Sequence, residues 1–243
     1  MRPSNALMKS SSKLPIIGRV WDSTIGKKLL VALTGLILVL FLVGHLTGNL
    51  LIFLGEKSFN DYAALLHGLA HGAGIWIARL GLLAAVVIHI AATISLTRRN
   101  KAARRAYENE STIQAKKSSL VMIWTGLTIL AFIIYHLIHF TFRPTFPAED
   151  YVYRSELKEV QFNAYRMVID GFQNWVVVLF YVIAISMLCS HLSHGVQAMF
   201  QTLGLRSKKS AGMLDKFSYG FAAVIWLGFI SIPVSILIFN YGS

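Results

Sequence analysis

Five long stretches of the chain contain no Asp, Glu, Lys or Arg, and polar, mostly basic segments separate them. They are residues 29–54, 80–97, 118–142, 171–205 and 217–243. A helix needs about 20 apolar residues to cross the ~30 Å hydrocarbon layer of a membrane, and each stretch can supply them. The pattern predicts an all-α membrane protein with five transmembrane helices, at about 29–54, 75–97, 119–142, 172–196 and 217–239.

The composition agrees with a single membrane domain covering residues 1–243. Of the 243 residues, 55% are hydrophobic and only 14% are charged, against about 25% charged in a typical soluble domain. The first apolar stretch lacks a small-residue cleavage site, so we expect it to be retained as a helix. A single cysteine, Cys189, excludes an internal disulfide and an iron–sulfur cluster held by this chain alone. No internal repeat is evident.

Basic residues predict the orientation. Of the 23 lysines and arginines, 17 lie on one side of the predicted bundle, in the N-terminal segment and in every second connection between spans. These segments are residues 1–28, 98–117 and 206–216. By the positive-inside rule the N-terminus is cytoplasmic and the C-terminus is outside. The net charge of +12 therefore reflects topology, and we do not expect nucleic-acid binding. The basic run 98–105 is a candidate contact for a soluble partner.

Two connections on the outer side are long enough to carry structure of their own. Residues 56–74 contain His67 and His71, four residues apart, and residues 143–170 are rich in charge and tyrosine. We expect both segments to form short amphipathic helices along the membrane surface.

Six of the eight histidines fall within the predicted spans, at positions 45, 89, 136, 139, 191 and 194. An ionisable residue at membrane depth indicates function, although a single histidine is equally compatible with a hydrogen bond between helices. With a helical rise of ~1.5 Å per residue, His45 and His136 lie level, ~24 Å from the cytoplasmic side. His89 lies at about 14 Å, roughly 10 Å below them, and His191 also belongs to the inner half.

Two pairs of imidazoles at two depths favour bis-histidine ligation of two haem irons within a helix bundle. A four-ligand zinc site needs imidazoles that converge at one level, and a di-iron site needs Glu-x-x-His motifs, which the spans lack. Ligation on both axial positions favours electron transfer over oxygen binding. A proton-coupled transporter that uses the histidines as a relay, without haem, is an alternative from a different class.

Four segments carry a resemblance to a known family: STIGKKLLVALTGLILVLFLVGHLTGNL (23–50), VIHIAATISLTRRN (87–100), IYHLIHF (134–140) and CSHLSHG (189–195). They resemble the single-chain, five-helix, dihaem cytochrome b subunit of succinate:quinone oxidoreductases, which include succinate dehydrogenases and fumarate reductases. The resemblance implies that the first four helices form the haem-binding bundle. His45 and His136 would bind the distal, outer haem b, and His89 and His191 the proximal one.

The resemblance also implies the partners and the reaction. The succinate site lies on another subunit, a flavoprotein with FAD, and an iron–sulfur subunit docks on the cytoplasmic face of this chain. Electrons would pass through the two haems to a membrane quinone, for which we expect menaquinone. The chain would be the quinone-reactive subunit of the complex, in the cytoplasmic (inner) membrane of a bacterium.

The quinone site is less defined, and no catalytic residue is assigned to it. Asp61 and His67 are candidates because they follow the outer end of the first helix, although a solvated surface helix explains them equally well. His139 and His194 are expected to be neighbours of the ligands. Some fumarate reductases of the family carry a glutamate at the place of Cys189, and its absence favours succinate oxidation. The dihaem cytochrome b of a hydrogenase or formate dehydrogenase is the nearest alternative, but the H-x-x-G-N segment from His45 favours the succinate family.

Overall fold

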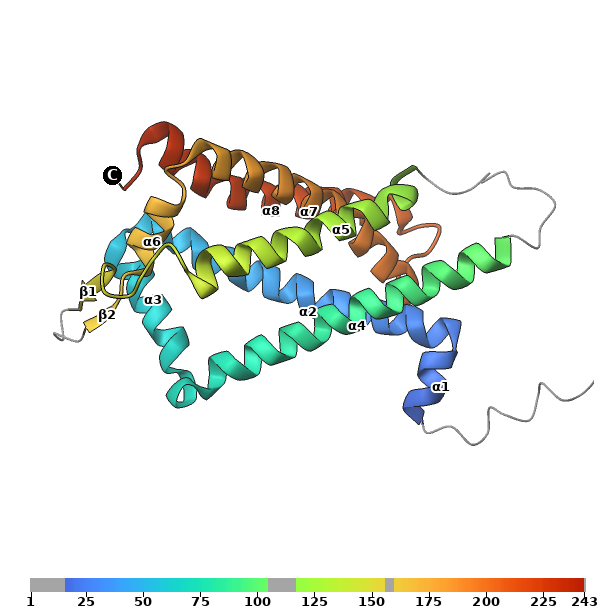
Figure 1. Cartoon of the computed structure of the whole chain (residues 1–243). Coiled ribbons are helices and arrows are strands. Elements are labelled where there is room, and N and C mark those ends of the chain that lie inside the picture. The colour runs from blue at the N-terminus through green and yellow to red at the C-terminus, as the bar shows by residue number, and fades with distance from the viewer. Residues whose placement is uncertain (1–15, 105–116, 156–159, 243) are drawn as a thin grey trace, which may run out of the picture.

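The computed structural model describes residues 16–104, 117–155 and 160–242, which form mostly helices (Figure 1). Five of these helices are long and apolar enough to cross a membrane. They are α2 (Thr24–Leu50), α4 (Ala73–Arg104), α5 (Lys117–Leu137), α7 (Trp175–Thr202) and α8 (Ala211–Phe239). The predicted five spans are confirmed, and the chain is a multi-pass membrane protein.

Several helices extend past the apolar stretches that predicted them. Helix α4 continues to Arg104, beyond the predicted end at 97, and α8 begins at Ala211 instead of 217. Lysine, arginine, leucine and methionine are good helix formers, so a helix continues through a basic segment that lies outside the hydrocarbon. Apolar stretches indicate which part of a helix fits lipid, and they do not show where the helix ends.

Shorter elements connect the spans. Helix α1 (Ile16–Asp22) precedes α2, and α3 (Glu56–Gly68) and α6 (Ala164–Gly171) lie in the two segments for which surface helices were predicted. A 3₁₀ turn, η3 (Leu51–Leu54), follows α2, another, η4 (Leu69–Gly72), follows α3, and a π-helical turn, η5 (Ile138–Phe142), ends α5. Strands β1 (Val152–Arg154) and β2 (Val160–Phe162) pair as an antiparallel hairpin. The hairpin was not predicted because three residues are too few to show an alternating pattern.

The bundle has two unlike ends. At the first, which we call the basic end, α2, α5 and α8 begin and α4 and α7 finish. It carries exposed Lys28, Arg98, Arg99, Lys208, Lys209 and Lys216. At the opposite end, the hairpin end, α3, the β-hairpin and α6 lie together (Figure 1). Of the predicted partner contact 98–105, Arg98 and Arg99 are exposed on α4, and residue 105 lies outside the described residues.

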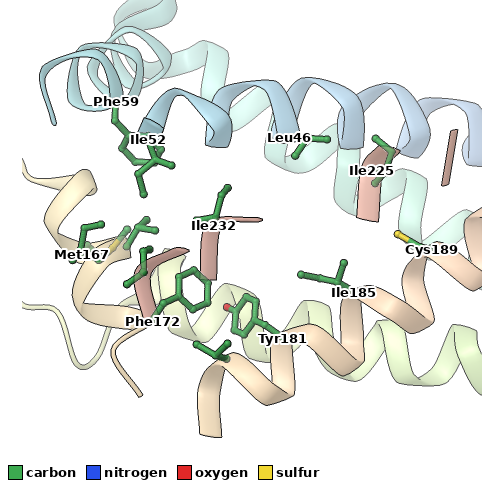
Figure 2. Close-up of a cluster of buried hydrophobic side chains, with 14 of the residues drawn as sticks. Leu46, Ile52, Phe59, Met167, Phe172, Tyr181, Ile185, Cys189, Ile225 and Ile232 are labelled. Atoms are coloured by element: carbon green, nitrogen blue, oxygen red, sulfur yellow. The ribbon is translucent and has the colours of Figure 1, made fainter. Parts of the chain in front are cut away.

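A cluster of buried hydrophobic side chains lies where α7 and α8 meet α2 (Figure 2). Buried Leu46, Ile185, Cys189, Ile225 and Ile232 line this contact. A Cβ atom at Gly228 of α8 would lie 2.9 Å from the terminal methyl groups of Leu46, so a larger residue there would have to displace the Leu46 side chain. In addition, α2 packs against α4 and α5 against α7. Each helix with a predicted haem ligand is therefore supported by another helix of the set.

A buried polar network holds the hairpin end together. The side chains of Asn60 of α3 and Asn163, which precedes α6, are 1% and 5% exposed. Asn60 donates from Nδ2 to Oδ1 of Asn163 at 3.1 Å and accepts from the backbone N–H of Tyr165 at 3.0 Å. Asn163 caps α6 by accepting from the backbone N–H of Arg166 and donates to Glu56. Because buried polar groups are stable only when hydrogen-bonded, this network fixes α6 on α3.

Candidate functional site

The four predicted ligands lie on four different helices. His45 is on α2, His89 on α4, His136 in the last turn of α5 and His191 on α7. All four imidazoles are partly buried, so each ring is held by its surroundings and keeps part of its surface free of protein contacts. Among the described residues, no three His, Cys, Asp or Glu side chains gather as a metal-binding group. The histidines are therefore arranged by pairs and not as one cluster.

His45 and His136 form the pair nearer the hairpin end. Their ring centroids are 5.8 Å apart and their planes lie at 83° to each other. Metal ions bind an imidazole nitrogen at about 2 Å, so two rings on opposite sides of one ion have centroids roughly 6 Å apart. The observed separation fits such an arrangement, and His45 and His136 are suitable as the two axial ligands of a haem iron.

Aromatic side chains surround this pair. Phe41 stacks on His45 with centroids 5.3 Å apart, and Phe132, one turn before His136, lies 5.8 Å from that ring. Phe140 contacts His136 from the opposite direction at 5.8 Å. These rings exclude water from the imidazoles and provide an apolar surface, as a flat apolar cofactor requires.

The H-x-x-G-N segment that begins at His45 has a structural basis. A Cβ atom at Gly48 would come within 2.5–2.7 Å of the Tyr62 ring, so only glycine lets Tyr62 of α3 pack on α2. Asn49 donates from Nδ2 to the backbone oxygen of His45 at 2.7 Å, and the same nitrogen lies 3.3 and 3.4 Å from the two ring nitrogens. The segment therefore joins α3 to α2 and places an amide beside the His45 ring.

The second pair, His89 and His191, lies nearer the basic end, and each ring rests on a neighbouring helix. Nδ1 of His89 is 3.1 Å from Oγ1 of Thr34 on α2. In the same way, Nδ1 of His191 is 3.1 Å from Oγ1 of Thr125 on α5.

The spacing between the two levels follows from these contacts. Thr34 precedes His45 by 11 residues, and Thr125 precedes His136 by the same number. At ~1.5 Å per residue the two levels are about 16 Å apart along the helices, more than the ~10 Å predicted. The prediction counted His45 from Leu29 and His89 from Arg98, but α2 begins at Thr24 and α4 continues to Arg104, so these two residues do not mark one common level.

His139 is connected to the first pair through a tyrosine. Tyr181 of α7 is only 3% exposed, and its hydroxyl lies 3.3 Å from Nδ1 of His136 and 3.1 Å from Nδ1 of His139. His139 therefore contacts the partner of a predicted ligand, whereas His136 faces His45 directly. His194 lies beside Tyr219 of α8, with ring centroids 6.3 Å apart.

The candidates for the quinone site lie on the surface of α3. Asp61 and Lys57 form an exposed ion pair at 2.7 Å. His67 is exposed, and its Nδ1 lies 2.8 Å from the backbone oxygen of Ala63. His71 is exposed as well and has a positive φ of 55°. The structure does not bring Asp61 and His67 together with the histidine pairs.

A cavity of about 370 Å³ opens at the hairpin end, beside α6. Its lining includes Glu56, Tyr165, Arg166, Asp170 and Gln173, but neither Asp61 nor His67. Burial, with a smaller effect of the neighbouring Tyr241, raises the pKa of the Tyr165 hydroxyl, which is therefore a neutral hydrogen-bonding group. Glu56 adds a carboxylate, so the cavity combines a neutral donor with a titratable acceptor.

The prediction that the chain has no internal repeat is wrong, because a short repeat marks the residues around the two histidine pairs. Residues 34–45, TGLILVLFLVGH, and 125–136, TGLTILAFIIYH, share Thr, Gly, Leu, Phe and His at the same places. In both copies the threonine contacts a histidine of the second pair. The histidine that ends each copy belongs to the first pair, and the phenylalanine of the same copy contacts its ring. A comparison of the chain with itself would have identified Thr34 and Thr125.

Comparisons of the chain with protein-family models, with curated proteins and with solved structures found no match. The function proposed below therefore depends on the residues and on their arrangement.

Proposed function

We propose that the chain is the membrane anchor and cytochrome b subunit of a succinate:quinone oxidoreductase that holds two haem b groups. The main supporting observation is the proximity of the His45 and His136 rings, whose centroids are 5.8 Å apart with their planes nearly perpendicular, among helices apolar enough to span a membrane. A second pair, His89 and His191, lies about 16 Å away along the same helices. The resemblance of the four quoted segments to the dihaem succinate family supports the identity of the complex.

Each group of residues has a defined task in this proposal. His45 and His136 hold the distal haem, and His89 and His191 hold the proximal one. When bound, the haems supply one-electron transfer between an iron–sulfur subunit and membrane quinone. The aromatic rings of Phe41, Phe132 and Phe140 exclude water from the distal pair. The packing of α2 on α4 and of α5 on α7 keeps the four imidazoles at their two levels.

The exposed charges of the basic end support a proposal for the partner that binds there and for the side of the membrane that it faces. By the positive-inside rule it faces the cytoplasm of a bacterium, so the N-terminus is cytoplasmic and the C-terminus is outside. Its exposed lysines and arginines attract an acidic surface of the iron–sulfur subunit, which connects the chain to the FAD-containing flavoprotein with the succinate site. Exposed charge pairs are screened by salt, so this association weakens as the ionic strength rises.

The hairpin end is the proposed place for quinone, with menaquinone as the expected species. The cavity beside α6 offers Glu56 and Tyr165, and the earlier candidates Asp61 and His67 lie on the exposed surface of the adjacent α3. A quinone head group needs a hydrogen-bond donor and a proton acceptor, and the cavity contains both kinds of group.

Purification of the tagged chain from native membranes in mild detergent tests the proposal. We expect it to bring down a flavoprotein with FAD and an iron–sulfur protein, and we expect succinate to reduce the b-type absorption of the complex. Malonate, a succinate analogue, should prevent this reduction, whereas dithionite should still produce it. Reduction by hydrogen or formate but not by succinate would instead identify the anchor of a hydrogenase or formate dehydrogenase. Absence of b-type absorption from the purified complex would contradict every haem-based assignment.

A further inference from the structure

Two threonines occupy equivalent positions against the second pair of histidines. Thr34 and Thr125 begin the two copies of the repeat, and each hydroxyl lies 3.1 Å from Nδ1 of a histidine on the adjacent helix. The glycine that follows each threonine lies under the same ring. A Cβ atom at Gly35 would be 3.5 Å from Cε1 of His89, and one at Gly126 would be 3.6 Å from Cε1 of His191. Both rings are thus held in the same way, each by one copy of the repeat.

The hydrogen bonds of the threonines determine which ring nitrogen carries the proton. A threonine hydroxyl has a single proton to donate. Thr34 donates to the backbone oxygen of Leu30 at 2.6 Å, and Thr125 donates to that of Met122 at 3.1 Å. Since a carbonyl oxygen cannot donate, each hydroxyl has only its lone pairs left for the histidine. With the hydroxyl proton directed at the carbonyl oxygen, the facing Nδ1 carries the hydrogen and donates it to the threonine.

A neutral imidazole with its proton on Nδ1 presents an unprotonated Nε2, which is the form that binds a metal ion. We infer that Thr34 and Thr125 are positioning residues that select the Nδ1–H tautomer of His89 and His191 and so make Nε2 of both rings the iron-binding atom. The tautomer follows from the hydrogen bonds alone, whereas the identification of the metal as haem iron depends on the proposed function.

The first pair does not have this arrangement. The neighbour of the His45 ring is the Asn49 amide nitrogen, which is a donor, and the neighbour of His136 is the Tyr181 hydroxyl, which either donates or accepts. Neither group imposes the Nδ1–H tautomer as the occupied threonine hydroxyls do. The inference is therefore specific to the second pair.

A hydrogen bond from Nδ1 makes the imidazole a more basic ligand. A more basic ligand favours the ferric form, so loss of the threonine hydroxyl should raise the midpoint potential of the proximal haem. Valine is the appropriate replacement because it keeps the β-branched shape of threonine and removes only the hydrogen-bonding oxygen. Serine keeps the hydroxyl and should restore the original behaviour.

The first experiment uses the haem-free full-length chain labelled with ¹⁵N-histidine in detergent or lipid. We expect the NMR signals of His89 and His191, assigned with single His→Gln variants, to show the Nδ1–H tautomer. Thr34→Val should shift only His89 toward the other tautomer, Thr125→Val should shift only His191, and the serine variants should resemble the original chain. Thr47→Val and Thr128→Val are matched controls, because these exposed threonines donate to the carbonyl four residues earlier and form no hydrogen bond to a histidine of the described residues. An Nε2–H tautomer in the original chain, or no change in the valine variants, would overturn the inference.

The second experiment is a potentiometric titration of the haem-loaded chain. We expect Thr34→Val and Thr125→Val to leave two haems bound and to raise the midpoint potential of one of them. The oxidised-to-reduced ratio of that haem should change threefold to tenfold, by up to about 59 mV for a one-electron couple. Two bound haems with unchanged potentials would refute the role of the threonines and leave the proposed function intact. Absence of haem from the original chain would refute the proposed function, whereas the tautomers would still be decided by NMR.

Discussion

The variant His136→Ala should bind one haem per chain instead of two, whereas His139→Ala should bind both. His136 faces His45 with ring centroids 5.8 Å apart, so its removal leaves the distal iron with one axial ligand. His139 meets the pair indirectly, through the Tyr181 hydroxyl and the Phe140 ring, and its loss leaves both ligands in place. The haem content per chain, measured as pyridine haemochrome, distinguishes the two histidines although they are three residues apart.

Two further variants complete this test. His45→Ala should match His136→Ala, because both remove a ligand of the same haem, and the double variant should lose no more than either single variant. Loss of a haem in His139→Ala, with two haems retained in His136→Ala, would show that the ligand of α5 has been assigned one turn too early.

Substitution of Asn60 by alanine should destabilise the protein by about 2–4 kcal/mol. It removes the donor to Asn163 and the acceptor for the backbone N–H of Tyr165, in a place where both asparagines are almost completely buried. A buried polar group left without its partner costs about 1–3 kcal/mol. The loss of helical signal during titration of detergent-solubilised protein with SDS measures the effect.

Asn174 provides the matched control for this substitution. It caps α7 by accepting from the backbone N–H of Val176, in an exposed position and without a second helix as partner. Asn174→Ala should cost about 1 kcal/mol, as is usual for loss of an N-cap. Equal destabilisation by the two variants would show that the buried network between α3 and α6 contributes no more to the free energy of unfolding than an exposed helix cap does.

Spans and histidine levels could be predicted because they depend on short-range sequence features. A span is a run of about 20 uncharged residues, and a depth is a count along one helix. The count placed His45 and His136 level, and their rings do face each other. The spacing between the two levels was less accurate, because α2 and α4 both continue through basic residues and a common boundary cannot be located from charge alone.

Contacts between residues far apart in the sequence could not be predicted from such local features. Thr34 meets His89 across 55 residues and Thr125 meets His191 across 66, and no local pattern predicts which side of a helix will face which neighbour. The link from His139 to Tyr181 depends on the approach of α7 to α5 in the same way. The repeat at 34–45 and 125–136 was the one available signal, because equivalent segments have equivalent neighbours.

The haem content of the purified, unsubstituted chain tests the central claim most directly. The dithionite-reduced minus oxidised spectrum, quantified against protein by pyridine haemochrome, should show two haem b per chain, with low-spin signals from bis-histidine ligation in electron paramagnetic resonance. A chain that binds no haem after expression with sufficient haem supply, or that binds one haem with His45, His89, His136 and His191 all intact, would contradict the account.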